Sequence, residues 1–426
     1  MENVSRARGY IVILVLCIIH VLVPIERGFP AIRIGGYPIT VPMLVSIIVF
    51  TFLFVKSGGH IVWALPKMYV PYQIIVVCVL LISALISNDV EAGLFNVLLY
   101  STIFIVDFLI LYHLFNMGFR EQFSVILCIV ASIAALIGIV EGTFHYYLPF
   151  YKQIFLSYDY ERISYTMIRS DFRALLGTLG NPLVYSVAMV LVIPFAMEIR
   201  NSFKKFFVVT LLILASFLAA STTSLIMGAF LLTGYYLLSR RKTRLVLLGV
   251  GVVVFIMLFV LHPFLERSSG NVISAWTAEF DFRNFENPQA MNIQIRRDLF
   301  IWALEQFWSD RSFASVLFGH GLKSSITTVS ALRLGNLQTF DNTYINLLFE
   351  SGIMGLAAFL LMGLNMVVGF RKRAWDNLHW YSVLSLLVAG MAFTTIYYGT
   401  FNFIWVASVA ALSSDTHLRR MQTMVS

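Results

Sequence analysis

The sequence is poor in charged residues. Asp, Glu, Lys and Arg make up only 12% of the 426 residues, against about 25% in a typical soluble domain. Hydrophobic residues make up 59%, and the mean hydropathy is +0.83. This balance excludes a soluble enzyme and a disordered chain. At about 20 apolar residues for each crossing of a bilayer, the chain has material for roughly a dozen crossings.

Cysteine is also scarce, and the common cofactor motifs are missing. The three cysteines, Cys17, Cys78 and Cys128, lie inside apolar runs without the spacing of a disulfide framework or a metal site. The sequence has no His-Glu-x-x-His, no Cys-x-x-Cys and no phosphate-binding Gly-x-x-x-x-Gly-Lys loop. We therefore expect buried free thiols, no metal and no other cofactor.

The net charge of +8 needs an explanation in a chain with so few charges. In a soluble protein it would suggest a nucleic acid partner. In a membrane protein, basic loops gathered on one side explain it, and we expect no nucleic acid binding.

Twelve apolar runs predict an all-α, polytopic membrane protein with a single integral membrane domain over residues 1–426. The first run, 10–24, is followed by Ile25-Glu26-Arg27 and has no small-residue cleavage site, so it is expected to be a retained helix. The run at 342–369 exceeds about 20 residues, so we expect it to tilt or to begin outside the hydrocarbon. The predicted helices cover 10–24, 39–55, 70–87, 94–114, 122–140, 182–199, 205–220, 222–238, 245–262, 342–369, 378–396 and 400–414.

Basic residues gather in alternate loops, and this predicts the orientation. Seventeen of the 30 basic residues lie in these loops, against five acids. The positive-inside rule then places both termini in the cytoplasm. The basic residues of these loops are Arg6, Arg8, Lys56, Lys67, Arg120, Arg200, Lys204, Lys205, Arg240, Arg241, Lys242, Arg244, Arg371, Lys372, Arg373, Arg419 and Arg420.

Two long loops, 141–181 and 263–341, fall on the outer side in this topology. Both are rich in arginine, whose planar fork suits phosphate and carboxylate groups. Pairing with acids of the same loops is the alternative for any one arginine. Residues 292–310 predict an amphipathic helix, because Ile293, Phe300, Leu304 and Phe307 share a face with Arg297. The outer arginines are Arg162, Arg169, Arg173, Arg267, Arg283, Arg296, Arg297, Arg311 and Arg333.

Three further polar features stand out. Asp107 lies inside an apolar run, where a charge is costly, so it should face protein or water. Glu350 shares a helix face with Asn346, Thr343 and Asn342, which predicts a polar cleft open to the outside. His320, between Gly319 and Gly321, has the pattern of a loop histidine.

Three stretches in order resemble the O-antigen polymerase and ligase superfamily, a group of membrane glycosyltransferases. The resemblance covers roughly residues 165–370. Its stretches are Arg173 with Gly177-Thr178-Leu179-Gly180-Asn181-Pro182, then Arg296-Arg297 with Trp302-Ala303-Leu304 and Leu317-Phe318-Gly319-His320-Gly321, and finally Asp341-Asn342-Thr343-Tyr344-Ile345-Asn346-Leu347-Leu348-Phe349-Glu350-Ser351-Gly352-Ile353-Met354-Gly355.

The resemblance implies an enzyme of the bacterial inner membrane with the GT-C type of architecture and two long periplasmic loops. Such enzymes use a polyprenyl-diphosphate-linked glycan as donor and need no metal. A chain-length regulator and a flippase of the same pathway would be partners. Family ligases usually carry His-Asn where this chain has Asp341-Asn342, which favours an O-antigen polymerase over a ligase that transfers the glycan to lipid A–core. Many members also carry Ser-Arg-Gly where Ser224 is followed here by Leu225.

The resemblance and the residue chemistry together suggest roles for nine residues. Fixed arginines can stabilise the negative charge that develops on a diphosphate leaving group. Asp341 is the best-placed carboxylate to accept or orient the proton of the acceptor hydroxyl. A lipid-linked oligosaccharide transporter is the non-enzymatic alternative, although it would be expected to show more charges deep in the membrane. We expect Asp341, Arg173 and Arg297 to be catalytic, and Arg169, Arg296, Asn342, Tyr344, His320 and Glu350 to bind substrate.

Overall fold

Helices make up almost all of the structure. The computed structural model describes residues 2–22, 32–34, 37–57, 69–144, 168–169, 172–173, 182–219, 222–238, 288–309, 312–331, 340, 342–374, 377–390 and 402–414. The extended segments in this part are two short antiparallel pairs, β1 (Ile32–Ile34) with β2 (Tyr37–Ile39) and β3 (Ile168–Arg169) with β4 (Phe172–Arg173). The all-α fold class is therefore confirmed.

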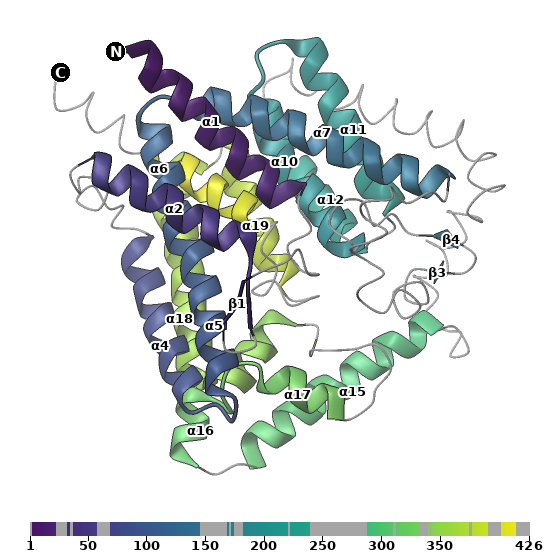
Figure 1. Ribbon diagram of the computed structural model, residues 1–426. Helices are drawn as coiled ribbons and strands as arrows, with labels where there is room; N and C mark the ends of the chain where they lie inside the picture. Colours follow the sequence, from purple (N-terminus) through teal and green to yellow (C-terminus); the bar gives the residue numbers. More distant parts are fainter. Residues whose placement is uncertain are drawn as a thin grey trace.

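The first half of the chain supplies a group of helices at one end of the molecule and a helical pair that runs to the other end (Figure 1). A π-helix, η1, lies between α5 and α6 within one continuous helical stretch. The elements are α1 (Glu2–Val21), α2 (Val41–Lys56), α4 (Val70–Leu85), α5 (Val90–Ser101), η1 (Thr102–Asp107), α6 (Phe108–Asn116) and α7 (Arg120–Phe144).

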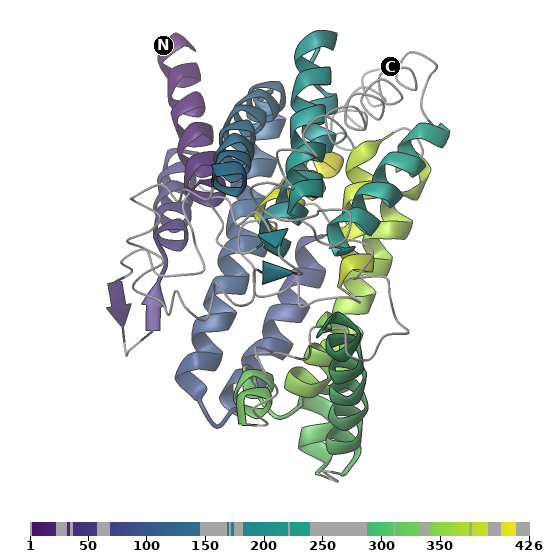
Figure 2. The ribbon, with the colours of Figure 1, turned by 90° about the vertical axis from the view of Figure 1, so that its right-hand side faces the viewer.

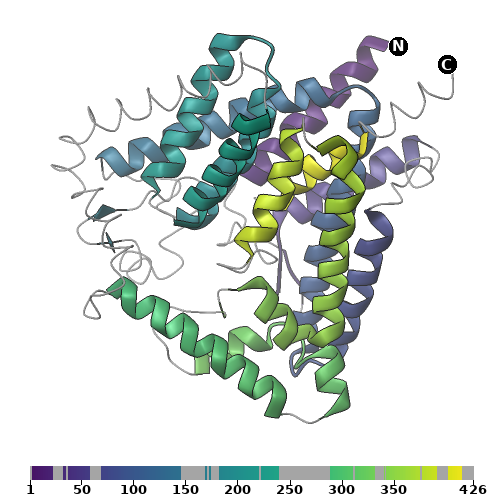
Figure 3. The same ribbon diagram turned by 180° about the vertical axis from the view of Figure 1, so that it is seen from behind.

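The second half completes the bundle and adds three helices below it (Figures 1 and 3). The expected break near residue 221 is confirmed, because α11 ends at Leu218 and α12 begins at Thr222. The predicted helix at 245–262 lies outside the described residues. The elements are α10 (Pro182–Met197), α11 (Ser202–Leu218), α12 (Thr222–Leu238), α15 (Pro288–Ser309), α16 (Phe313–Phe318), α17 (Ser324–Ala331), α18 (Thr343–Ala374), α19 (Leu378–Ala389) and a last helix, Asn402–Ser414.

Several helices begin with an N-capping side chain or with a proline in the first turn. The Asp89 carboxylate accepts a hydrogen bond from the Ala92 N–H at 2.9 Å and begins α5, and Asn201 does the same for α11. Pro42 and Pro71 occupy first-turn positions of α2 and α4, where the missing N–H has no partner to lose.

The outer surface of the bundle is apolar, which marks it as a membrane protein. Val55, Ile48 and Leu364 are 72%, 65% and 59% exposed, on α2 and α18. Large exposed apolar side chains in such number suit lipid rather than water. Three helical stretches are long and apolar enough to cross a membrane: Val90–Asn116, Arg120–Val140 and Thr343–Phe370. In contrast, α10 is buried along nearly its whole length, between α7, α11, α12 and α19.

The predicted long helix at 342–369 is divided by a break at Gly352. This residue has φ 65° and ψ −166°, outside the helical region. The rings of Tyr344 and Phe359 lie 6.1 Å apart, whereas fifteen residues of straight helix would separate them by roughly 22 Å. The limb before Gly352 therefore folds back along the limb after it.

Candidate functional site

The Gly319–Gly321 turn docks against the break in α18. The His320 N–H donates to the Phe349 carbonyl at 2.8 Å, and the Gly321 N–H donates to the Glu350 carbonyl at 3.1 Å. Gly319 and Gly321 have φ of 77° and 95°, and a Cβ on either would overlap neighbouring backbone, that of Glu350 or of Ser87. The second and third stretches of the family resemblance thus form one interlocked unit.

Glu350 lies buried in this unit, 1% exposed. Its carboxylate accepts hydrogen bonds from the Ser325 hydroxyl and from the backbone N–H groups of Lys323 and Ser325. These amides stand at the start of α17, where the helix dipole favours a negative charge. The backbone carbonyl of Glu350 also accepts a hydrogen bond from Ser83 of α4 at 2.5 Å. Glu350 therefore ties α17 and α4 to α18.

The prediction of a polar cleft open to the outside is wrong, because most residues of the predicted polar face of α18 are buried. Thr343 and Asn346 are buried like Glu350, at 0% and 1% exposure, and Asn342 is half-buried. The Glu350 carboxylate can be buried because the first residues of α17 donate hydrogen bonds to it. A cavity of about 20 Å³ remains beside them, room for about one water molecule and not for a sugar. It is lined by Leu80, Asn96, Leu99, Tyr100, Leu322, Asn346, Leu347 and Glu350.

Lys323, next to this unit, has a strained backbone. Its φ is 66°, and it is the only residue other than glycine with a positive φ in the described part of the chain. Its ammonium lies 5.8 Å from the centre of the Phe95 ring. Burial lowers the pKa of Lys323, while the nearby Glu350 and Asp89 act in the opposite direction. Sequence reasoning missed Lys323 and Ser325, since neither lies in a recognisable motif.

The remaining predicted residues near α18 have structural partners. The Asn342 side chain accepts hydrogen bonds from the N–H groups of Tyr344 and Ile345 at 2.9 and 3.1 Å, and so begins α18. The Tyr344 hydroxyl donates to the Leu387 carbonyl of α19 at 2.5 Å. The His320 ring packs on Phe349 with centroids 4.6 Å apart. Asp341 lies outside the described residues.

The four predicted site arginines belong to three elements on one face of the molecule. Arg169 and Arg173 belong to β3 and β4, and Arg296 and Arg297 belong to α15. Figure 2 shows the β3–β4 pair and α15 on the face turned to the viewer. The side chains of Arg169, Arg173 and Arg296 lie outside the described residues.

The Arg297 side chain is 66% exposed, 2.9 Å from Asp298. The helix predicted at 292–310 is confirmed as Pro288–Ser309, but the predicted shared face is wrong, because Phe300 is exposed whereas Phe307 is buried. Arg297 shares a stripe with Phe300, Ile301 and Trp308 at helical offsets. Phe300, Ile301 and Trp308 are 39%, 46% and 64% exposed. Leu299 and Ala303 of α15 pack with Phe340, Ile345 and Phe349. Leu304 is half-buried against this cluster. We name the exposed set, Arg297 with Phe300, Ile301 and Trp308, the α15 stripe.

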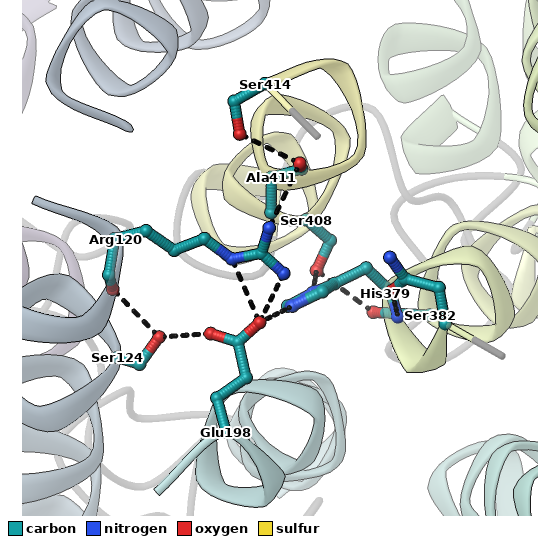
Figure 4. A network of polar contacts seen from close by, with 9 residues as sticks. Arg120, Ser124, Glu198, His379, Ser382, Ser408, Ala411 and Ser414 are labelled. Carbon is teal, nitrogen blue, oxygen red and sulfur yellow. Dashed lines mark hydrogen bonds and ion pairs between the residues drawn. The ribbon is translucent and has the colours of Figure 1, made fainter. Parts of the chain in front are cut away.

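A second polar cluster joins α7, α10, α19 and the last helix, at the end of the bundle away from α16 and α17 (Figure 1). Figure 4 shows its contacts from close by. Arg120 of α7 and Glu198, the residue after α10, form an ion pair. Nε2 of His379 lies 3.0 Å from Oε1 of Glu198, and Nδ1 lies 3.2 Å from the Ser408 hydroxyl. Burial alone would raise the pKa of Glu198, but His379 and Arg120 outweigh it and lower this pKa to about 2.

The cluster joins ends of α7, α10, α19 and the last helix, which come from four distant parts of the chain. From the sequence, Arg120 and Glu198 were expected only as charges of the loops on the basic side. Their shared end of the bundle agrees with that grouping, although the side of the membrane that it faces stays a prediction. Because its side chains bond to one another and to the backbone of the last helix, we assign the cluster a structural role.

Comparison with known proteins does not assign a family to the chain. No protein-family model matches the chain, and a search of curated proteins finds no relative.

Proposed function

We propose that this chain is a membrane glycosyltransferase that polymerises polyprenyl-diphosphate-linked glycan repeats, as an O-antigen polymerase does. The α15 stripe carries the proposal. It combines an exposed guanidinium with a row of exposed apolar side chains, on a helix outside the predicted spans. A lipid diphosphate presents the complementary groups, an anionic head and an apolar tail.

The arginine-bearing elements support a role in stabilising the leaving group. In glycosyl transfer, the bond between the sugar and the diphosphate breaks, and its electron pair passes to the diphosphate oxygen. Guanidinium groups held in place beforehand can stabilise that charge. Arg297 is accessible for this role, since its described partner is the exposed Asp298. In this proposal Arg296, Arg169 and Arg173 complete the donor site.

The acceptor sugar loses a proton from its attacking hydroxyl as the new bond forms. Asp341 is our candidate to accept or orient this proton, as it directly precedes Asn342 at the start of α18. The usual pKa of about 4 for an aspartate makes it a weak base at neutral pH, so either its surroundings raise the pKa or it orients the hydroxyl. His320, Asn342, Tyr344 and Glu350 hold the surrounding backbone in place.

The wider setting belongs to the same proposal. We place the chain in a bacterial inner membrane, with about twelve crossings, GT-C type architecture and both termini in the cytoplasm. Its substrates are the lipid-linked donor and acceptor glycans. A chain-length regulator and a flippase of the same pathway are the proposed protein partners.

A reconstituted assay tests the proposed function. The full chain in proteoliposomes would receive a synthetic polyprenyl-diphosphate oligosaccharide, and products would be resolved on a gel. A ladder of repeats supports the polymerase. Transfer only when lipid A–core is added would instead indicate a ligase, and movement of unchanged substrate across the bilayer would indicate a transporter. Asp341→Asn should reduce the ladder sharply if Asp341 accepts the proton and only modestly if it orients the hydroxyl. The exposed-site control Glu121→Gln should leave the ladder unchanged.

A further inference from the structure

Three polar side chains meet inside the membrane-spanning bundle, away from the proposed glycan site. Nε2 of His20, on α1, lies 3.4 Å from the Ser46 hydroxyl of α2 and 3.5 Å from Oδ2 of Asp107 on η1. All three residues are buried, at 2%, 0% and 0% exposure. The His20 ring is stacked on Phe403 of the last helix, with centroids 4.0 Å apart.

The hydrogen bonding of this trio is incomplete. Neither Asp107 oxygen meets the geometry of a hydrogen bond in the described part of the chain, and neither does Nδ1 of His20. Ser46 and His20 are the polar groups that approach the carboxylate. Buried side-chain polar atoms nearly always have at least one hydrogen-bond partner. The carboxylate oxygens of Asp107 and Nδ1 of His20 can therefore accept a hydrogen bond or a proton from a ligand.

The backbone at Asp107 departs from regular α-helix. Residues Thr102–Asp107 form a π-helix, with α-helix on both sides. Short π-helical segments inside α-helices occur frequently at functional sites. This one packs against α2, which carries Ser46, and ends at Asp107, an acidic residue deep inside a span predicted from sequence.

Charge balance decides how many protons the pair holds. A net charge inside a bilayer is costly, so the favoured state of His20 and Asp107 is neutral overall. That state carries one proton, on the carboxyl beside a neutral ring or on the ring beside a carboxylate. The other titratable groups on α1, α2, α5, α6 and the last helix are Glu2, Arg6, Arg8, Tyr10, Cys17, Lys56, Glu91, Tyr100, Tyr112 and His113.

A small cavity beside His20 gives water a place next to the pair. Its volume of about 10 Å³ is close to the space that one water molecule needs. Its lining includes His20, Thr102 and Thr40, the residue before α2. The Thr40 hydroxyl is buried without a hydrogen bond partner in the described residues, so it is free to hold such a water.

We propose that His20 and Asp107 form an intramembrane proton-binding site that holds one proton, exchanged with water through the cavity at Thr40. Exchange transfers a proton from a hydronium ion to the pair and releases water, and the reverse step returns it. The site goes beyond the proposed glycosyl transfer and does not depend on it.

Spectroscopy of the full chain in lipid nanodiscs at about pH 7 tests the number of protons. Infrared spectra with carbon-13 aspartate report whether Asp107 is protonated, and solid-state NMR with nitrogen-15 histidine reports the charge of His20. Asp107→Asn and His20→Asn assign the signals. Ser46→Ala, which keeps both groups and shifts their signals, replaces either variant that does not fold. One proton on the pair is expected. A carboxylate beside a neutral ring, or a protonated acid beside an imidazolium, would overturn the proposal.

Exchange into heavy water tests the route. The Asp107 and His20 signals should change within minutes in the wild-type protein and at least tenfold more slowly in Thr40→Val, which keeps the shape but loses the hydroxyl. An unchanged exchange rate in Thr40→Val would rule out the route through this cavity. Glu350→Gln, at the other buried carboxylate, is the control and should leave both signals and their exchange unaltered.

Discussion

The Ser325 hydroxyl donates a hydrogen bond to the Glu350 carboxylate and so joins α17 to α18. A hydrogen bond contributes about 0.5–1.5 kcal/mol to stability. We expect Ser325→Ala to lower the free energy of unfolding by about this amount, measured by thermal unfolding in detergent. Ser57→Ala is the control, because its exposed hydroxyl bonds only to the Phe54 carbonyl in its own helix. Equal effects of the two substitutions would contradict a special role for the Ser325–Glu350 bond.

The turn at Gly319 should tolerate no side chain. A Cβ there would overlap the Glu350 backbone, and overpacking a tight interior costs about 1–3 kcal/mol in addition to the strain of a positive φ. Gly319→Ala should therefore reduce folded protein in the membrane several-fold. Gly118→Ala, also at positive φ but with no atom within 4 Å of the added Cβ, isolates the strain. Similar yields of the two variants would argue against the interlocked turn.

The Glu198 cluster predicts a loss of stability in acid. The folded-state pKa of about 2 lies below the value of about 4.3 for an unfolded glutamate. Ionised Glu198 thus stabilises the fold above about pH 4.3, and this contribution disappears as the pH falls towards 2. The difference in stability between wild type and Glu198→Gln should shrink as the pH falls from about 5 towards 2. A difference that persists unchanged to about pH 3 would refute this assignment.

Glu121→Gln is the matched control for that series. Glu121 pairs with Arg200 at 2.7 Å, but both side chains are largely exposed, and exposed pairs contribute little. Its substitution should leave the acid transition in place.

Arg297 should be required as a guanidinium, not only as a positive charge. If it grips a diphosphate through two N–H groups, Arg297→Lys should fail nearly as badly as Arg297→Ala. Loss of one fixed donor at comparable sites lowers the rate about 10²–10³-fold. Polymer formation and membrane abundance should be measured together, with the exposed Arg200→Ala as control. Full activity of Arg297→Ala at normal abundance would remove Arg297 from the donor site.

The orientation can be tested by cysteine labelling in a background without Cys17, Cys78 and Cys128. Ser309, exposed at the end of α15, should be labelled as Ser309→Cys from the outer side. Asn201→Cys, between α10 and α11, should be labelled only after the reagent enters the cytoplasm. Ser325, although in the same outer loop, is fully buried and unsuitable for this purpose. The reverse pattern would overturn both the topology and the proposed mechanism.

Local patterns in the sequence predicted most helices but few contacts of the site. Hydropathy located the spans and helical offsets located α15, because both depend on residues close in the chain. The pairs Ser325–Glu350 and Arg120–Glu198 join residues 25 and 78 positions apart, and such pairing depends on how the helices pack. The polar face of α18 is a similar case. Its periodicity in the sequence predicts which residues share the face, but not which other helices pack against it. His20 was not singled out, as nothing local connects it to Asp107.

The break at Gly352 also bears on the order in which the protein assembles during synthesis. The limb before it, Thr343–Ser351, meets partners on α4, the Gly319–Gly321 turn and α17, all of which have already left the ribosome. Among the described residues, the contacts with Phe359 and with α19, through Leu387 and Gly390, must wait for later residues. The limb can therefore dock from the side of the finished α16–α17 segment, and the insertion machinery need not pass residues 343–370 across the bilayer as one straight crossing.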